Sequence, residues 1–362
     1  MTGSAITGWG KCLPPTVLTN HDLEMLVDTS DDWITSRTGI KERRISHVGT
    51  AELATVAGFR ALAAAGLEPP DVDLVSVATC TPDMLLPSAA SLVQDRLGAV
   101  NAGAVDQNAA CSGFLYSLIT ASGMVQAGIV ESALVIGAER LTYFIDFTDR
   151  GTAVLFGDGA GAVVVQATDE PGGLKGSRMG SDGSLAKLLW APGSGTATDR
   201  VALESNHKHL AVEMNGPEVF KKAVTAMGDA AAAVVEQAGW ALDDVDILIP
   251  HQANIRIIDA TARRLHLDPA KVFINIASYG NTSAATIPIA LTEALEMGRV
   301  EPGARIVFAA FGAGLSWAAA AYEFGSRTEP LGVSDAELPP TDGDVMALLA
   351  ENFAYFGGGP DR

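Results

Sequence analysis

Three residues with the chemistry of a nucleophile-centred site stand on small-residue turns of this sequence. Cys111 lies in the segment NAACSGF, His251 in IPHQAN and Asn281 in YGNTSAA. The pattern around Cys111 predicts a buried strand, a tight turn and then a helix. A cysteine at a helix start feels the positive end of the helix dipole, so we expect a lowered pKa and a reactive thiolate. The alternative is that Cys111 is an inert buried residue. We interpret the other two cysteines, Cys12 and Cys80, in that way.

Composition limits the classes of protein that this chain can belong to. Its 362 residues are 48% hydrophobic and 19% charged, which is typical of a globular chain of two domains or one duplicated domain. The net charge of −19 argues against nucleic acid as a partner. No apolar run reaches the roughly 18 residues that span a membrane, and no signal peptide is evident. Three scattered cysteines favour a reducing cytoplasm and no zinc site, and we interpret His207 and His209 as part of a solvated loop.

The sequence contains an internal repeat with a constant spacing. The matching pairs, all 173 positions apart, are Val72–Val75 with Val245–Leu248, Ala65–Leu67 with Ala238–Trp240, Asn108 with Asn281, and Ala133–Val135 with Ile306–Phe308. A spacing this long is unlike that of a solenoid repeat, so each copy should be a layered α/β unit.

Secondary-structure signals recur in the same order in both copies. Alanine-rich helices are expected over Glu52–Ala65 and Thr225–Ala238, each stopped by a glycine. Apolar runs predict buried strands at Leu74–Ala78, Leu134–Gly137, Ile247–Ile249 and Ile306–Ala310. Alternation of strands and helices predicts mostly parallel sheets covered by helices. Because Cys111 comes from the first copy and the other two candidates come from the second, we expect the site at the seam between them.

Six segments, in this order, carry a resemblance to a known family. They are DDWITSRTGIKERR, the Cys111 segment, DRGTAVLFGDGAGA, IPHQANIRII, YGNTSAATIP and FGAGLSW. Over about residues 1–324 the chain resembles β-ketoacyl-acyl-carrier-protein synthase III, a member of the thiolase superfamily. The resemblance implies a thiolase-like duplicated α/β fold of two mixed, mostly parallel sheets with helices in αβαβα layers. The halves would be residues 1–172 and 173–324, followed by a linker and short amphipathic helix in residues 325–362.

The resemblance also implies a role for each candidate. Cys111 would take an acyl group from acyl-CoA as a thioester. His251 and Asn281 would bind the malonyl thioester carbonyl and stabilise the enolate left by decarboxylation. Backbone N–H groups of Cys111 and Ala313 would hold the oxyanion of the condensation step, although many family members carry glycine at the latter position. Phe311 would shield the thiolate from water.

The asparagine separates this chain from other members of the superfamily. Elongating ketoacyl synthases use two histidines with the cysteine, and degradative thiolases use a second cysteine. Plant-type polyketide synthases share Cys-His-Asn but carry a GFGPG motif that is absent here. The GDGAGA run lacks the spacing and the later acidic residue of a dinucleotide-binding fingerprint, so we expect no nicotinamide site. With acyl-CoA as a substrate, we expect no tightly bound cofactor. Glu139 and Asp158 are interpreted as structural groups near turns.

Further positions match substrate and partner contacts of the family. The resemblance implies that Trp33 and Arg150 sandwich the CoA adenine, that Arg37 contacts phosphate, and that Gly151, Phe220 and Asn254 line the pantetheine channel. The basic residues Lys221, Arg256, Arg263 and Arg264 would dock the acidic acyl carrier protein, the alternative being a solvated basic face.

A homodimer is expected from the same resemblance, with the loop that carries Leu86 reaching the acyl pocket of the partner. Acetyl-selective relatives carry an aromatic ring where this chain has Leu86, so a longer or branched primer is our hypothesis, unless Trp190 fills the space. The leading function is condensation of acyl-CoA with malonyl-carrier protein in fatty acid or polyketide initiation. The alternatives are a starter-unit or ester-forming acyltransferase without decarboxylation and a non-catalytic subunit.

Overall fold

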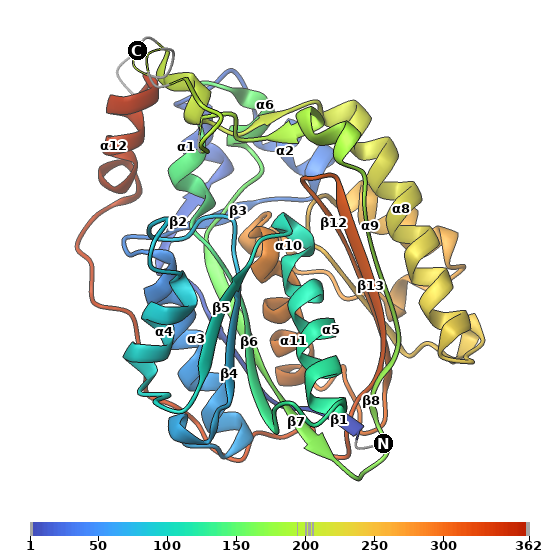
Figure 1. The fold of residues 1–362 in the computed structure, drawn as a ribbon. Helices are drawn as coiled ribbons and strands as arrows, with labels where there is room; N and C mark the ends of the chain where they lie inside the picture. The colour runs from blue at the N-terminus through green and yellow to red at the C-terminus, as the bar shows by residue number, and fades with distance from the viewer. Residues whose placement is uncertain (1–2, 194, 200, 202–203, 205, 360–362) are drawn as a thin grey trace.

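Two β-sheets form the frame of the molecule (Figure 1), which is described by a computed structural model over residues 3–193, 195–199, 201, 204 and 206–359. The first sheet has the strand order β1 (Gly3–Cys12), β7 (Gly159–Thr168), β6 (Ser132–Glu139), β4 (Leu74–Ala78) and β5 (Gly103–Gln107). The second has the order β11 (Ile247–Pro250), β12 (Arg305–Gly312), β13 (Ser316–Glu323) and β8 (Gly173–Ser181). The boundary expected at residue 172 lies in the turn between β7 and β8.

Both sheets are mixed, as expected, but the parallel share is smaller than the sequence indicated. Strand β4 pairs in parallel with β5 and β6, and β11 pairs in parallel with β12. The remaining neighbours, β1 with β7, β6 with β7, β12 with β13 and β13 with β8, are antiparallel. The short turn at residues 313–315 joins β12 to β13, and so short a connection can only bring the chain back antiparallel.

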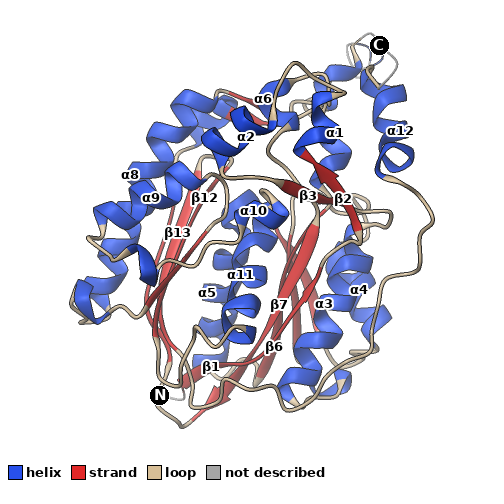
Figure 2. Cartoon of the chain, turned by 180° about the vertical axis from the view of Figure 1, so that it is seen from behind, coloured by secondary structure: helices blue, strands red, loops and turns tan. Residues whose placement is uncertain are grey.

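Helices separate and cover the sheets in five layers (Figure 2). The outer face of the first sheet packs against α3 (Thr50–Ala65) and α4 (Ala89–Leu97), and that of the second against α8 (Gly216–Gln237) and α9 (Ile255–Arg264). Between the sheets lie α5 (Gly113–Gln126) and α11 (Thr286–Glu296). This arrangement confirms the αβαβα expectation. Helix α8 begins nine residues before the predicted Thr225, after the Asn215 N-cap.

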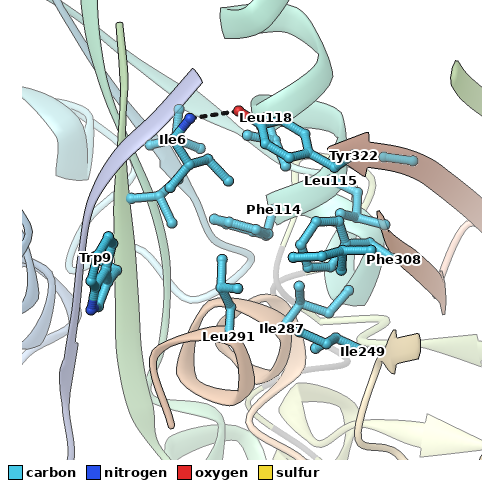
Figure 3. Packing of buried hydrophobic residues seen from close by; sticks show 14 of the residues in the cluster. Ile6, Trp9, Phe114, Leu115, Leu118, Ile249, Ile287, Leu291, Phe308 and Tyr322 are labelled. Atoms are coloured by element: carbon cyan, nitrogen blue, oxygen red, sulfur yellow. Dashed lines mark hydrogen bonds between the residues drawn. The ribbon is translucent and has the colours of Figure 1, made fainter. Parts of the chain in front are cut away.

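The central layer contains the largest apolar side chains of the core (Figure 3). Phe308 on β12 points into this layer together with Phe114 on α5, whereas its strand neighbours Val307 and Ala309 face α8. This alternation follows from the twofold period of a strand that is buried on both faces. The hydroxyl of Tyr322 accepts a hydrogen bond from the backbone N–H of Ile6 at 2.6 Å, which links the two sheets at this layer.

Smaller elements surround the carboxyl ends of the strands. They are the pairs β2 (Thr16–Thr19) with β3 (Glu42–Ile45) and β9 (Leu189–Trp190) with β10 (Glu213–Met214), and the helices α1 (Asn20–Glu24), α2 (Asp31–Thr38), α6 (Arg150–Ala153) and α10 (Ile276–Tyr279). In parallel-stranded α/β units, ligands bind outside the carboxyl ends of the strands, so these elements surround the expected site.

The internal repeat is also seen in the bounds of equivalent elements and in the backbone conformation of equivalent turns. Strand β12 begins and ends 173 residues after β6, and the short 3₁₀ helix at Ser283–Ala285 lies 173 residues after the one at Ala110–Ser112. Ala110 and Ser283 both adopt a left-handed backbone, with φ of 46° and 50°. Each turn leads directly into a central helix, α5 or α11.

The chain after the second half returns to the first. Residues 325–344 run along α3 and α4 (Figures 1 and 2), where Ala336 and Leu338 pack against the outer apolar cluster. Helix α12 (Val345–Phe356) begins where the amphipathic pattern predicted and buries Leu349, which is 1% exposed. The side-chain amide of Asn352 donates to the Thr142 carbonyl at 2.7 Å. The sequence left open what this helix packs on, and the structure places it on the body of the same chain.

Candidate active site

Cys111 stands at the turn between β5 and α5, where the strand-turn-helix pattern predicted it. Its side chain is buried, with 8% of the residue exposed, and the left-handed Ala110 bends the chain immediately before it. Gly312 approaches so closely that a Cβ there would lie 2.7 Å from the Cys111 nitrogen. The glycine at the end of β12 therefore permits the two halves to meet at Cys111.

The expected lowering of the Cys111 pKa is wrong for this structure. Burial raises the pKa of Cys111 to about 12, a hydrogen bond with Ser283 opposes the rise, and the carboxylate of Glu139 adds to it. The cause is desolvation, because a thiolate surrounded by protein loses more hydration than the hydrogen bonds from Ser283 and from its own backbone return. The resting side chain is therefore a thiol.

His251 follows β11 directly and is held from both sides. Its backbone N–H donates to the Ala309 carbonyl at 2.8 Å, and its Nδ1 lies 2.7 Å from the Thr286 hydroxyl oxygen. The residue is 2% exposed, and burial lowers the pKa of its imidazole to about 3. At neutral pH His251 is thus an uncharged ring with one proton to donate and one nitrogen to accept.

Asn281 lies on the turn after α10, beside Gly280, whose φ is 62°. Its backbone N–H donates to the Leu155 carbonyl at 2.9 Å, and its side-chain Oδ1 accepts the Ser283 N–H at 2.8 Å. Because the carbonyl oxygen of the side chain is engaged, the amide NH₂ is the group available to a ligand. The turn thereby orients Asn281 as a hydrogen-bond donor.

A cavity of about 430 Å³ brings these three residues together. Cys111, His251, Asn281 and Phe311 line it, as do five of the six expected CoA-binding residues: Trp33, Arg37, Gly151, Phe220 and Asn254. The side chain of Arg256, assigned to carrier-protein docking, lines the same cavity. Residues from both halves and from α2, α8 and α9 therefore form one channel that ends at the thiol.

A second cavity of about 470 Å³ meets the first at Cys111. Trp190, Ala313 and Ser283 line it, together with Cys80 and Phe144. Ala313 is not among the described non-glycine residues with a positive φ. Alanine therefore adopts this backbone conformation without strain and retains its N–H group. Leu86 lines neither cavity and is 83% exposed, so within one protomer it forms no part of an acyl pocket.

The expected adenine sandwich requires a movement of Arg150. The guanidinium carbon of Arg150 lies 4.7 Å from the centroid of the Trp33 ring, and that of Arg37 lies 4.9 Å from it. Two stacked layers need about 7 Å, so no base fits between Trp33 and Arg150 as they stand. Arg150 also donates to the Asp28 carbonyl at 2.9 Å, a bond that must break for the side chain to open.

The basic residues assigned to carrier-protein docking lie on α8 and α9. Lys221, Arg256, Arg263 and Arg264 are all exposed. Lys221 pairs with Glu218 at 2.6 Å, and Arg264 forms an ion pair with Asp229. Such exposed pairs hold little free energy, so they remain exchangeable for an incoming acidic partner.

Sequence reasoning missed a buried polar network beside Cys111. Glu139, at the end of β6, accepts hydrogen bonds from the hydroxyls of Thr81 at 2.6 Å and Ser283 at 2.9 Å. The Cys80 thiol also donates to it, at 3.3 Å, so Cys80 is a half-buried cavity residue and not the inert core residue expected. Burial raises the pKa of Glu139, against these hydrogen bonds. The sequence signal that could have identified Glu139 was its position at the carboxyl end of a predicted strand, where ligand-binding sites of α/β folds form.

Asp158 keeps the structural role that the sequence suggested. It accepts bonds from the Ser46 N–H at 2.8 Å and the Thr142 hydroxyl at 2.6 Å, which tie the β3 region to the segment after β6. His207, expected in a solvated loop, stacks on Tyr355 of α12 with 4.7 Å between ring centroids.

The layered, duplicated fold and its shared Cys-His-Asn cavity define a thiolase-like enzyme. Residues 105–183 match the family model described as 3-oxoacyl-[acyl-carrier-protein (ACP)] synthase III, and residues 235–324 match the model of its C-terminal part. A relative from Vibrio cholerae, named β-ketoacyl-[acyl-carrier-protein] synthase III 2, is 52% identical over 346 residues, covering 96% of this chain and 95% of the relative. The chain belongs to the β-ketoacyl-acyl-carrier-protein synthase III family.

Solved structures agree with this assignment. The 3-oxoacyl-[acyl-carrier-protein] synthase III of Aquifex aeolicus superposes with a TM-score of 0.83 at 46% identity, covering 89% of this chain and all of that one. The priming β-ketosynthase from the R1128 polyketide biosynthetic pathway gives a TM-score of 0.84 at 35% identity, covering 91% of this chain and 97% of that one. Within the described residues, no helix combines the length and apolar character needed to cross a bilayer.

Proposed function

We propose that this chain condenses an acyl-CoA primer with malonyl-carrier protein, with loss of CO₂, through an acyl-Cys111 intermediate. The observation that carries the proposal is the single cavity lined by Cys111, His251 and Asn281. A thiol, a neutral imidazole and an oriented amide NH₂ supply a nucleophile and two uncharged groups for a thioester oxygen. The product is a β-ketoacyl thioester, the first intermediate of a fatty acid or polyketide chain.

The first half-reaction transfers the acyl group. The sulfur of Cys111 forms a bond to the acyl carbon, the bond from that carbon to the CoA sulfur breaks, and CoA leaves as a thiol. Since burial holds Cys111 in its thiol form, its proton has to move to an acceptor during the attack. The channel past Trp33, Gly151 and Asn254 gives the pantetheine arm a path to the sulfur.

The second half-reaction forms the carbon–carbon bond. Malonyl-carrier protein loses its carboxylate as CO₂, and the electron pair becomes an enolate whose oxygen is held by His251 and Asn281. The carbanion attacks the acyl carbon on Cys111, the N–H groups of Cys111 and Ala313 hold the resulting oxyanion, and the Cys111 sulfur is released and protonated. Phe311, which lines the same cavity, keeps water away from these intermediates.

The surface near the channel suits an acidic carrier protein. The whole chain has a net charge of −19, so attraction of an acidic partner has to be local. Lys221, Arg256, Arg263 and Arg264 provide it on α8 and α9, and Arg256 both lines the channel and donates to the Ser36 carbonyl at 3.3 Å. We therefore place the docking face at these two helices.

A homodimer completes the proposal. Among the described residues, β5 is one of the two edge strands of the first sheet, and its residue Val105 is 42% exposed. Leu85 and Leu86, in the neighbouring loop, are 85% and 83% exposed. Unpaired strand edges beside exposed apolar side chains pair with other chains, and a second copy would cover both. We expect a dimer by light scattering at micromolar concentration, and a stable monomer would contradict this.

The experiment that tests the activity separates it from its main alternative. The protein is incubated with acyl-CoA and malonyl-carrier protein, and mass spectrometry follows the mass of the enzyme, release of CO₂ and the carrier-bound product. Condensation predicts acylated enzyme, CO₂ and a β-ketoacyl product together. Acylated enzyme with no CO₂ would instead identify a starter-unit or ester-forming acyltransferase.

A further inference from the structure

The histidine of the site has a hydroxyl partner whose own proton is already engaged. Nδ1 of His251 lies 2.7 Å from the hydroxyl oxygen of Thr286, the first residue of α11. The same hydroxyl lies 2.9 Å from the Ser283 carbonyl oxygen. All three residues are buried, so water does not compete for these bonds.

The proton count fixes the direction of both bonds. A carbonyl oxygen can only accept, and a threonine hydroxyl has one proton to give. When Thr286 donates that proton to Ser283, its oxygen can only accept from His251. Nδ1 must then carry a hydrogen, and because the buried ring is neutral, Nε2 carries none.

We propose that Thr286 is a positioning residue that fixes the resting tautomer of His251, with the proton on Nδ1 and a free lone pair on Nε2. His251 lines the same cavity as Cys111, and since Nδ1 faces Thr286, Nε2 is the nitrogen available to the cavity. The resting enzyme thus holds a proton acceptor at the thiol. The tautomer follows from the hydrogen bonds alone. Only the role of Nε2 in acyl transfer rests on the proposed function.

The acyl transfer then balances without an external base. The Cys111 proton moves to Nε2 as the sulfur bonds to the acyl carbon, and the departing CoA sulfur takes that proton from Nε2. His251 returns to its neutral Nδ1–H form. The imidazolium of His251 is a short-lived intermediate, because burial of the ring opposes a positive charge.

The second half-reaction needs the other tautomer, and the same hydroxyl permits it. Turning the Thr286 O–H from the Ser283 carbonyl to Nδ1 requires rotation about one bond, because both acceptors lie within 3 Å. The ring then carries its proton on Nε2 and donates to the malonyl thioester oxygen. The ring loses one proton at Nδ1 and gains one at Nε2, and both exchange with water only while the bond between Nδ1 and Thr286 is open, so the net charge is unchanged.

Nitrogen NMR of the resting enzyme tests the proposal directly. Protein labelled with ¹⁵N-histidine gives separate signals for protonated and bare ring nitrogens, and His251→Gln assigns the relevant pair by its loss. We expect the hydrogen on Nδ1 in the wild type and in Thr286→Ser, which retains the hydroxyl. A resting wild type with its hydrogen on Nε2 would overturn the inference, whether or not the protein condenses anything.

Thr286→Val supplies the kinetic readout, with Thr286→Ser as its matched control. Valine removes the hydroxyl with little change of shape, so the ring is expected to move its proton to Nε2. Acylation of Cys111 should then slow on the order of 10²-fold, the lower range for a positioned base, while condensation by pre-acylated enzyme changes little. Equal slowing of both half-reactions would mean that Thr286 only supports the fold. Should Thr286→Val fail to fold, the wild-type spectrum still decides.

Discussion

The two halves of this molecule share a backbone plan and contribute different residues to one cavity. The turn before α5 carries Cys111, and the residue 173 positions later, before α11, is Ala284. Both turns contain one left-handed residue, Ala110 in the first half and Ser283 in the second. Duplication therefore supplied two equivalent positions at the seam, and only the first carries a cysteine. The second turn instead supplies the groups that orient the site.

The asparagines of the two turns make the comparison sharper. Asn281 Oδ1 accepts the N–H of Ser283 at 2.8 Å, and Asn108 Oδ1 accepts the N–H of Ala110 at 3.3 Å. The same side chain thus braces the same turn in both halves. Of these two asparagines, only Asn281 lies in the cavity with His251, so bracing is the shared property, and donation to a substrate is the role that we propose for Asn281 alone.

The largest effect is expected when the two turns are made alike. Cys111→Ala gives the first turn the residue found in the second, and it should abolish acyl-enzyme formation, because burial and Glu139 raise the pKa of the remaining cavity thiol, Cys80, well above its usual value. Cys12→Ala, in the buried strand β1, is the control and should acylate normally. Intact-protein mass spectrometry after incubation with acyl-CoA checks both, and an acyl mass retained on Cys111→Ala would disprove the assignment.

A smaller effect should separate bracing from donation. Asn281→Ala should still form acyl-Cys111 but lose condensation by roughly 10²–10³-fold, the cost of one donor to a developing oxyanion. Asn108→Ala loses the equivalent bracing bond and serves as the matched control. The measurement is the rate of each half-reaction in both variants. If Asn281→Ala impaired acylation and condensation equally, its role would be structural.

The smallest effect concerns a loop that the halves do not share. Residues 79–88 connect β4 to α4, whereas only residues 251–254 connect β11 to α9, and the longer loop carries Leu86. Leucine there leaves more room than an aromatic ring, and each added buried methylene is worth about 0.8 kcal/mol. We expect isobutyryl- or hexanoyl-CoA to be used at least as well as acetyl-CoA, and Leu86→Phe to restore acetyl preference several-fold.

The values of kcat/KM for the three primers, on the wild type and on Leu86→Phe, check this prediction. A wild type confined to acetyl-CoA would show that another group closes the pocket, and Trp190, which lines the second cavity, is the first to replace. Leu86 lines neither of the two described cavities that meet at Cys111 in its own protomer, so an effect of Leu86→Phe would also place the loop in the partner's pocket.

Much of the architecture could be predicted because it follows from local pattern and from the repeat. Strand β4 has the predicted bounds, and Gly66 ends α3 with φ of 69° as a helix-stop glycine should. The gathering of Cys111, His251 and Asn281 in one cavity also follows from a duplicated α/β fold. These features depend on periodicity, spacing and order, which a sequence displays.

What failed depends on burial and on contacts between distant residues. The Cys111 pKa was predicted in the wrong direction because desolvation is a property of the packed cavity, whereas a helix start is visible in the sequence. The contact of Arg150 with Trp33 joins residues far apart in the chain, as does the bond between Glu139 and Ser283. The sheets are less parallel than expected because a short turn after β12 reverses the chain.

The last helix has a consequence for the order in which the protein is made. Leu349 of α12 fills an apolar cluster otherwise drawn almost entirely from residues 18–156, with Ile276 as the other late member. The ribosome delivers the first half long before that helix, and a partly covered apolar surface is prone to aggregate. Packing of this apolar cluster is therefore completed only after residue 349 has been synthesised. A chain stalled before that point leaves the cluster partly exposed.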